Sequence, residues 1–275
     1  MSSISIPRKE SGTVTKKTIL KVGSKSLLLT IHENAFSIML YIGGHDLYCV
    51  NVFLSKSDNL ISGDLVHIYY NVNCSLEHNF QRGIDTNMII CLLMSYISRM
   101  YPLIETLKFN DASFRVCDNK YIVELPQMNY ITSGKTWYEK HFGVYLDTKE
   151  KERFLEYERK FQAAKKTTSW AYFRSFITSE LPFSEEEAEK LYDSVDSWQE
   201  FFRPVLDKIG ISQFCIFVSP WLNTFFLKFF KKSFVSFDYL MPITNSVKFT
   251  ETQYVHGGQR FTRKVIYKRP QDDGR

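Results

Sequence analysis

The stretch of residues 85–100 constrains the fold more than any other part of the sequence, because it is long, mostly apolar and unbroken by glycine or proline. Its apolar side chains cover most of a helical surface rather than one narrow stripe. This pattern predicts a helix buried on more than one side, which Pro102 ends.

A β-rich block precedes this helix. Short apolar runs alternate with turn signals such as Gly23-Ser24 and Gly43-Gly44, which predicts an antiparallel meander. The expected strands are residues 18–22, 27–31, 36–42, 47–54 and 64–72.

Short elements and then helices follow. Residues 107–109, 121–125 and 128–132 are expected as strands, and 135–142 as a helix that Gly143 caps. Helices are expected at 149–165, at 184–193 with a capping box, and at 196–208 and 212–232 with breaks at Pro204 and Pro220. Glycines 257 and 258 between two β-type segments, 247–255 and 260–268, predict a terminal hairpin.

This order predicts an α+β protein in four parts. They are a frayed N-terminus (1–13), an α/β domain (14–145), a mainly helical extension (146–245), and a C-terminal hairpin and tail (246–275).

Composition limits the function classes. Aromatic residues make up 16% of the chain, enough ring area for a dense core. The formal charge of +5 comes from 35 basic residues interspersed with 30 acidic ones, so no clear nucleic-acid surface is expected. Residues 1–17 lack the apolar core of a signal peptide, and no apolar run approaches the roughly 18 residues of a membrane span.

Five cysteines are scattered singly, with no CxxC pair. This pattern supports neither a disulfide framework nor a zinc site, and it favours reduced cysteines in an intracellular, cytoplasmic protein. The histidines are also widely separated, so no metal site is expected.

The element order in residues 14–142 resembles the GNAT superfamily of acyl-CoA N-acyltransferases. In that family a Gly-containing turn, Gln/Arg-x-x-Gly-x-Gly/Ala, leads from a strand into a helix and donates backbone N–H groups to the pyrophosphate of coenzyme A. The segment Trp137-Tyr138-Glu139-Lys140-His141-Phe142-Gly143 is similar to the family's final Tyr and Gly-Phe segment. The stretch GKTWYEKHFGVYL also resembles a segment of uncharacterised GNAT-like proteins of large DNA viruses.

The turn that this resemblance selects contains Gln81, Arg82, Gly83, Ile84, Asp85 and Thr86. A helix N-terminus suits a pyrophosphate, since its N–H groups are unpaired and carry partial positive charge. Here Phe80 stands where the family has Gln or Arg, and Asp85 stands at the second glycine position. Two interpretations remain open: an acetyl-CoA pyrophosphate site, or a structural helix start in which Asp85 caps the amides of residues 87 or 88.

Catalytic candidates follow from the same resemblance. Glu77 or His78, just past the last expected strand, would be the base that deprotonates an amine, and Tyr138 would protonate the leaving thiolate. The alternatives are loop polar residues for the first two and a packed aromatic with its hydroxyl at the surface for Tyr138.

Two further segments raise the question of partners. Residues 221–232 form an apolar, aromatic stretch with lysines near its end, expected either as a last core helix or as a partner or membrane face. The terminal hairpin could add a strand to the sheet of another protein.

Two functions therefore stand as expectations. The chain is either an acyl-CoA-dependent N-acetyltransferase with an altered pyrophosphate turn, or a non-catalytic structural or protein-interaction component, for example of a virus factory or virion.

Overall fold

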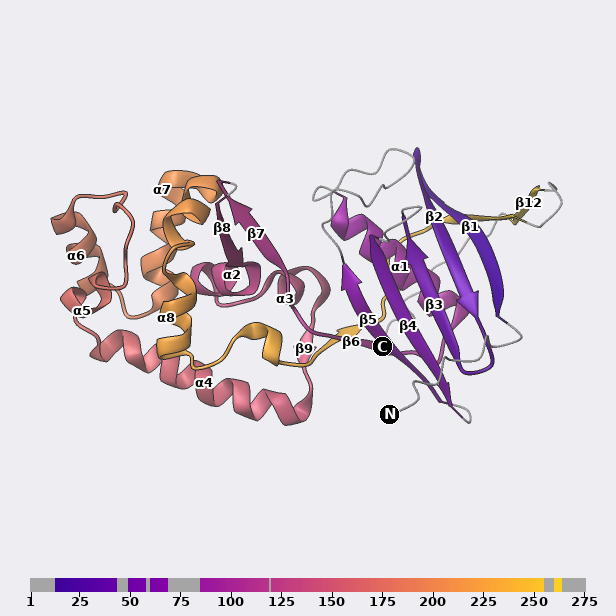
Figure 1. Ribbon diagram of the computed structural model, residues 1–275, viewed down its shortest axis with the longest axis horizontal. Helices are drawn as coiled ribbons and strands as arrows, with labels where there is room; N and C mark the ends of the chain where they lie inside the picture. The colour runs from indigo at the N-terminus through magenta and orange to yellow at the C-terminus, as the bar shows by residue number, and fades with distance from the viewer. Residues whose placement is uncertain are drawn as a thin grey trace, which may run out of the picture. The chain divides into compact units, whose positions relative to one another are not determined.

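The computed structural model describes residues 13–43, 49–57, 60–68, 85–118, 120–254 and 260–263. It shows an α+β protein with a mainly helical region after a sheet in the N-terminal half, as expected, but the large sheet is mixed and not wholly antiparallel (Figure 1). Two compact units result: unit 1 is Met1–Phe109 with Pro242–Arg275, and unit 2 is Asn110–Met241. The region 14–145, expected as one domain, thus contributes to both units.

Unit 1 begins with five consecutive antiparallel strands, so the predicted meander is confirmed over the described residues. Side chains along β2 and β3 alternate between buried and half-exposed, as a period of two requires when one face of a sheet is covered. The strands are β1 (Val14–Val22), β2 (Lys25–Glu33), β3 (Ser37–Ile42), β4 (Val50–Ser57) and β5 (Leu60–Ile68).

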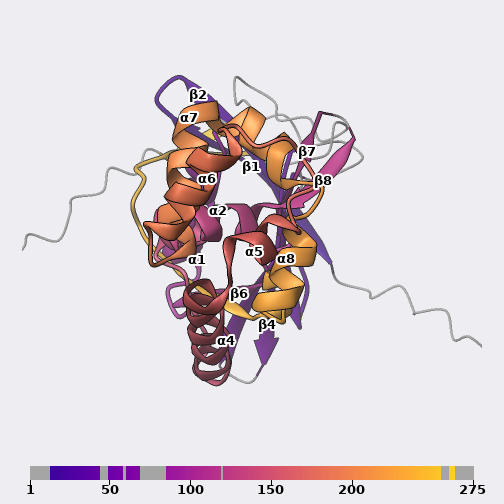
Figure 2. The ribbon, with the colours of Figure 1, turned by 90° about the vertical axis from the view of Figure 1, so that its left-hand side faces the viewer.

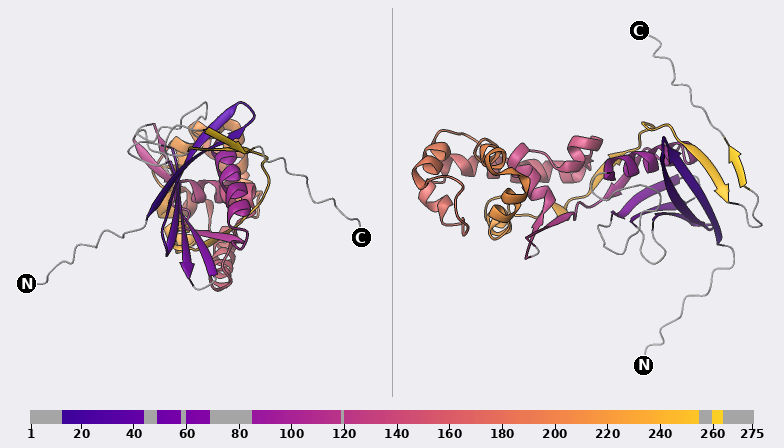
Figure 3. Two further views of the ribbon diagram at one scale, coloured as in Figure 1. Left: turned by 90° about the vertical axis from the view of Figure 1, so that its right-hand side faces the viewer. Right: turned by 90° about the horizontal axis from the view of Figure 1, so that it is seen from above.

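The long apolar helix is α1 (Thr86–Met100), and Figure 3 shows it lying along one face of the unit 1 sheet. Eight of its residues are buried, including Ser95 and Tyr96, which confirms burial on more than one side. It leads to β6 (Thr106–Phe109), which pairs parallel with β5 and makes the sheet mixed.

The C-terminal segment returns to unit 1 as β11 (Thr250–Tyr254), antiparallel to β1, and β12 (Arg260–Arg263) pairs with β11. The predicted terminal hairpin is therefore confirmed, and one of its strands adds to the sheet of its own chain. Glu251 is 4% exposed; it accepts a hydrogen bond from Thr18 and lies 3.5 Å from the Arg99 guanidinium of α1. These buried polar contacts fix the returning strand against both β1 and α1.

Unit 2 consists of helices with short strands (Figure 2). Its first elements are β7 (Phe114–Cys117), β8 (Tyr121–Glu124), α2 (Leu125–Ser133), α3 (Trp137–Phe142) and β9 (Tyr145–Leu146). The later ones are α4 (Thr148–Thr167), α5 (Trp170–Arg174), α6 (Glu185–Asp193), α7 (Trp198–Val218), α8 (Leu222–Phe229), the 3-10 turn η1 (Phe234–Ser236) and β10 (Tyr239–Pro242).

A dense aromatic core holds these helices together. Phe173 of α5 and Phe225 of α8 are fully buried, with ring centroids 5.6 Å apart in an edge-to-face arrangement. Trp198 of α7 lies edge-to-face on Phe225 at 4.8 Å and donates its indole N–H to the Phe161 carbonyl of α4. The high aromatic content of the sequence is thus used mainly here.

Two expected elements differ in the structure. Residues 128–132 were expected as a strand but lie in α2, because Pro126 occupies the first turn of that helix and Gly134 ends it with φ 70°. The break expected at Pro204 is absent from the described helix. α7 bends at Gly210, whose φ of 73° is readily adopted by glycine, and this bend lies between the expected helices 196–208 and 212–232. The break at Pro220, between α7 and α8, is confirmed.

The expectation of reduced cysteines is wrong, because Cys49, Cys117 and Cys215 are all disulfide-bonded. Cys117 at the end of β7 and Cys215 of α7 form a disulfide with Cα atoms 5.7 Å apart. The two residues are 98 positions apart in the sequence, so spacing alone carried no sign of the bond. Cys91 of α1 is a free thiol.

Candidate functional site

The turn before α1 is the first candidate site. Gln81, Arg82, Gly83 and Ile84 lie outside the described residues, as do Glu77 and His78, so the predicted base and most of the predicted pyrophosphate turn are not placed. The end of the turn is placed: Asp85 occupies the N-cap position and Thr86 is the first residue of α1.

Asp85 is an ion-pair partner. Its side chain is almost buried, and its carboxylate lies 2.5 Å from the Lys25 ammonium at the start of β2. It makes no capping hydrogen bond with the described first turn of α1, so the predicted position of the N-cap is right and the predicted bond is wrong. The Asp85 carboxylate therefore joins a strand to the helix start.

Tyr138 is the second candidate. A capping box between Thr136 and Glu139 starts α3: the Thr136 hydroxyl accepts from the Glu139 N–H, and the Glu139 carboxylate accepts from the Thr136 N–H. This start places Tyr138 inward, where it is 8% exposed and packs edge-to-face on Trp137 at 5.0 Å. Burial, with a smaller contribution from the charge of Asp111, raises the pKa of Tyr138 well above its usual range. The phenol is thus buried more deeply than the surface position considered for it.

Asp111 is a titratable residue that the sequence did not indicate as a site. It is 3% exposed, and its Oδ1 accepts hydrogen bonds from the Ser113 hydroxyl at 2.5 Å and the Ser113 N–H at 3.2 Å. Its Oδ2 is buried and has no hydrogen-bond partner among the described residues. The pKa of Asp111 is raised to about 6, mainly by burial; the Ser113 hydrogen bonds lower it, and the charges of Glu139 and Glu124 add a smaller rise.

The sequence indicated Asp111 only as a residue at the end of a strand. Asn110-Asp111 after an apolar run is typical of a turn, and Asp-x-Ser is typical of a side chain that bonds its own backbone two residues on. Neither pattern reveals burial, which comes from the packing of unit 2. Asp111 and Tyr138 belong to unit 2, whereas Asp85 belongs to unit 1.

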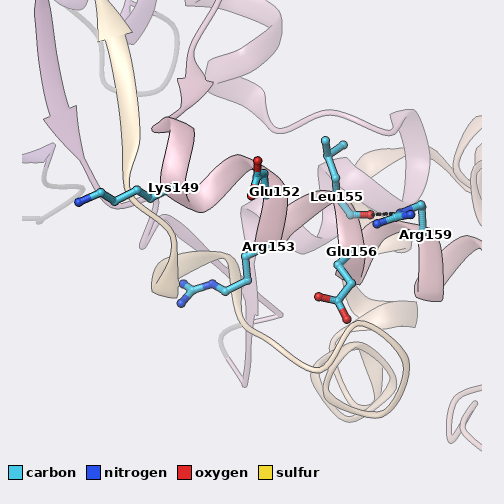
Figure 4. A pocket seen from close by; sticks show the side chains of 6 residues that line it. All are labelled: Lys149, Glu152, Arg153, Leu155, Glu156 and Arg159. Atoms are coloured by element: carbon cyan, nitrogen blue, oxygen red, sulfur yellow. Dashed lines mark hydrogen bonds between the residues drawn. The ribbon is translucent and has the colours of Figure 1, made fainter.

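A hollow of about 690 Å³ runs along the exposed face of α4 (Figure 4). Its lining side chains are Lys149, Glu152, Arg153, Leu155, Glu156 and Arg159. Charges of both signs alternate along it, and several are already engaged: Glu156 binds Lys160 at 2.5 Å, and Arg159 donates to the Leu155 carbonyl at 3.3 Å. This lining is typical of a solvated helix face and brings no nucleophile together with a base.

Among the described residues no group of three or more His, Cys, Asp and Glu side chains could hold a metal ion. In the described helices, none is by itself long and apolar enough to cross a membrane; α7 and α8 meet the criteria only as a pair, bent by 78°. The apolar stretch from Trp221 to Phe230 is mostly core, since Trp221, Leu222, Phe225 and Phe226 are at most 2% exposed.

Comparison with protein-family models, with curated proteins and with solved structures finds no match to this chain.

Proposed function

We propose that this chain is a non-catalytic binding component built on an α+β scaffold of GNAT-like element order. The observation that carries the proposal is the Lys25–Asp85 ion pair at the start of α1. A carboxylate at this position repels phosphate oxygens, and its partner cation is already used to neutralise it. The helix start is thereby tied to β2, which is a structural role.

The burial and the raised pKa of Tyr138 support the same proposal. A general acid must reach the reacting atom and release its proton near the working pH. Tyr138 is 8% exposed, and burial raises the pKa of its phenol. It is therefore poorly suited to both tasks. No acid is therefore assigned to the acyl-transfer reaction among the described residues.

A second candidate is the acyltransferase itself, favoured by the succession of β5, α1 and the parallel β6. A strand, a turn and a helix N-terminus in this order provide amides for an anion when the turn is open. This order of elements is compatible with descent from an acyltransferase, but a shared fold does not establish the activity. The proposed location of this binding component, a virus factory or virion, rests on the resemblance of one segment to viral proteins. The Cys117–Cys215 disulfide favours an oxidising environment such as a virion surface.

Thermal unfolding with acetyl-CoA separates the two candidates. A ligand at about 100 times its dissociation constant stabilises a protein by roughly 2.7 kcal/mol, which is a readily measured rise in Tm. We expect no rise with acetyl-CoA or with coenzyme A. A rise that Arg82→Ala removes and that Lys149→Ala, on the charged face of α4, leaves intact would overturn the proposal and favour the acyltransferase.

A further inference from the structure

The sheet of unit 1 has two faces, and α1 covers one of them. This face contains Leu20 and its register partner Glu251, and the Glu251 carboxylate lies 3.5 Å from the Arg99 guanidinium of α1 (Figure 3). α1 is the only helix among the described residues of unit 1. The opposite face, here called the outer face, therefore has no described helix of its own unit on it.

The outer face is apolar where the solvated face of an antiparallel sheet is usually polar. Ile19 of β1 is opposite Leu28 of β2 in the register. Met39 of β3 lies between His32 of β2 and Phe53 of β4. All five side chains are half-buried. The strands β1 to β4 thus carry apolar side chains on both faces.

Three aromatic rings gather on the outer face. Tyr41 follows Met39 by two residues and so points to the same side of the sheet. Its ring lies edge-to-face on His32 with centroids 5.3 Å apart, and its hydroxyl is 3.0 Å from the Met39 sulfur. Phe53 adjoins Met39 on the other side. Half-exposed rings held on a sheet are the surface on which unpaired bases stack in many RNA-binding domains.

The charged residues of the outer face are mostly lysines. Lys17 and Lys21 of β1 lie on either side of Ile19 and are exposed. Neither has an ion-pair partner among the described residues. Lys108 of β6 is exposed on the same face, opposite Asp64 of β5, which is the one acidic residue of this face in the described strands of unit 1. Cations therefore predominate beside the rings.

The two units also differ in total charge. Unit 1 contains 17 Lys and Arg against 11 Asp and Glu, a formal charge of +6, whereas unit 2 contains 18 against 19, a formal charge of −1. The positive excess, which is interspersed with acidic residues along the sequence, thus belongs to unit 1. This charge favours a polyanion as the partner of the outer face over a neutral or basic protein.

We propose that the outer face of unit 1 binds single-stranded nucleic acid. Bases stack on the rings of Phe53, Tyr41 and His32, and phosphates lie along Lys17 and Lys21. A duplex fits less well, because its bases are stacked on one another and present no free ring to a sheet. The inference names a partner for the proposed binding component and rests on that proposal.

Fluorescence anisotropy of labelled oligonucleotides of about 12 nucleotides tests the inference on the full chain. We expect saturable binding of a single strand, about tenfold or more tighter than binding of the duplex of the same sequence. Parallel titrations with RNA and DNA strands show which sugar the face prefers.

The salt dependence of binding tests the lysines. Because each contact between a lysine and a phosphate releases a counterion, Lys21→Ala should reduce the slope of log affinity against log salt concentration by about 0.7. Lys149→Ala changes an exposed lysine of unit 2 and is the matched control. It should leave the slope unchanged.

The rings are tested by Phe53→Leu, which removes the ring and keeps an apolar side chain at this half-buried position. We expect single-strand binding to weaken by about tenfold, the loss of one stacked base. Phe36→Leu is the matched control, because Phe36 is 69% exposed in the turn between β2 and β3, outside the strands of this face. Thermal unfolding verifies that each variant is folded.

Three results would each overturn the inference: no binding of either kind of single strand, a duplex bound as tightly as the single strand, or equal affinities for Phe53→Leu and Phe36→Leu. These titrations contain no acyl-CoA, and the unfolding test with acetyl-CoA contains no nucleic acid. Failure of the inference is therefore distinguishable from failure of the proposed function.

Discussion

The Lys25 ammonium lies 2.5 Å from the Asp85 carboxylate, and this ion pair joins the start of β2 to the start of α1. The side chain of Asp85 is 10% exposed and that of Lys25 34%. The pair is therefore neither a loose surface contact nor a fully buried one. The carboxylate at the start of α1 therefore has a structural role.

This pair should contribute measurable coupling energy. Asp85→Asn leaves a partly buried ammonium without its carboxylate, and we expect a loss of about 1–3 kcal/mol in the free energy of unfolding. Lys25→Met removes the cation instead. In a double-mutant cycle measured by urea unfolding, the two changes should cost less together than the sum of their separate effects, with a coupling of about 1–2 kcal/mol. Additive effects would mean that the contact does not hold the helix start.

Asp111 should make stability depend on pH in the opposite sense to an ordinary surface carboxylate. Its pKa in the folded chain, about 6, lies above the reference value of 3.8, so the folded state holds the proton more tightly than the unfolded state. Its contribution is therefore fully present below about pH 4 and is lost as the pH rises through about 6. Two pKa units correspond to about 3 kcal/mol at most.

Asp111→Asn isolates this contribution, because the amide stays neutral. The difference in unfolding free energy between variant and parent should shift in favour of the variant by about 2 kcal/mol between pH 4 and pH 8, because the cost of burying the new N–H₂ group is the same at both pH values and cancels from the shift. Asp118→Asn, in the exposed turn, serves as the control. Parallel stability curves for the Asp111 variant and the parent would contradict the raised pKa.

The disulfide should stabilise unit 2 by restricting its unfolded state. Cys117 and Cys215 close a loop of nearly a hundred residues, for which removal of a disulfide typically costs about 2–5 kcal/mol. We expect Cys117→Ser to lower stability in this range, whereas Cys91→Ser, which changes a free thiol, should not. Peptide mapping without reductant checks the bond directly: a peptide containing Cys117 should be recovered linked to one containing Cys215. Recovery of both as free thiols would refute the pairing.

The sequence predicted those features that follow from local pattern. The meander, the buried α1 and the capping box of Ser184 with Glu187 each depend on residues close in the chain, and all three are present. The errors have longer-range causes. Pro126 is compatible with the end of a strand or the first turn of a helix, and the packing of α2 against α7 decides between them.

The candidate site was harder to predict for the same reason. The cysteine pair and the burial of Asp111 and Tyr138 depend on which segments meet in unit 2, which no spacing of residues reveals. Asp85 was correctly placed at the helix start, but its partner Lys25 lies sixty residues earlier in the chain.

Gly63 should be among the least replaceable residues of the sheet. It lies in β5 opposite Leu107 of β6, in the parallel pair that makes the sheet mixed. A Cβ at this position would be 2.5 Å from Leu107 Cδ2 and 2.9 Å from Leu54 Cδ2, and both leucines are fully buried. Neither can move into solvent, so we expect Gly63→Ala to cost about 1–3 kcal/mol through overpacking.

A compensating change distinguishes overpacking from other costs of alanine at position 63. Leu107→Ala alone opens a cavity and should itself destabilise the sheet, by about 2–5 kcal/mol. Combined with Gly63→Ala, it frees the space that the new methyl group needs, so the double variant should be more stable than the sum of the single effects predicts. Ser62→Ala, an exposed neighbour in β5, should change little. Strict additivity at residues 63 and 107 would show that the close approach of β5 and β6 is not what requires glycine.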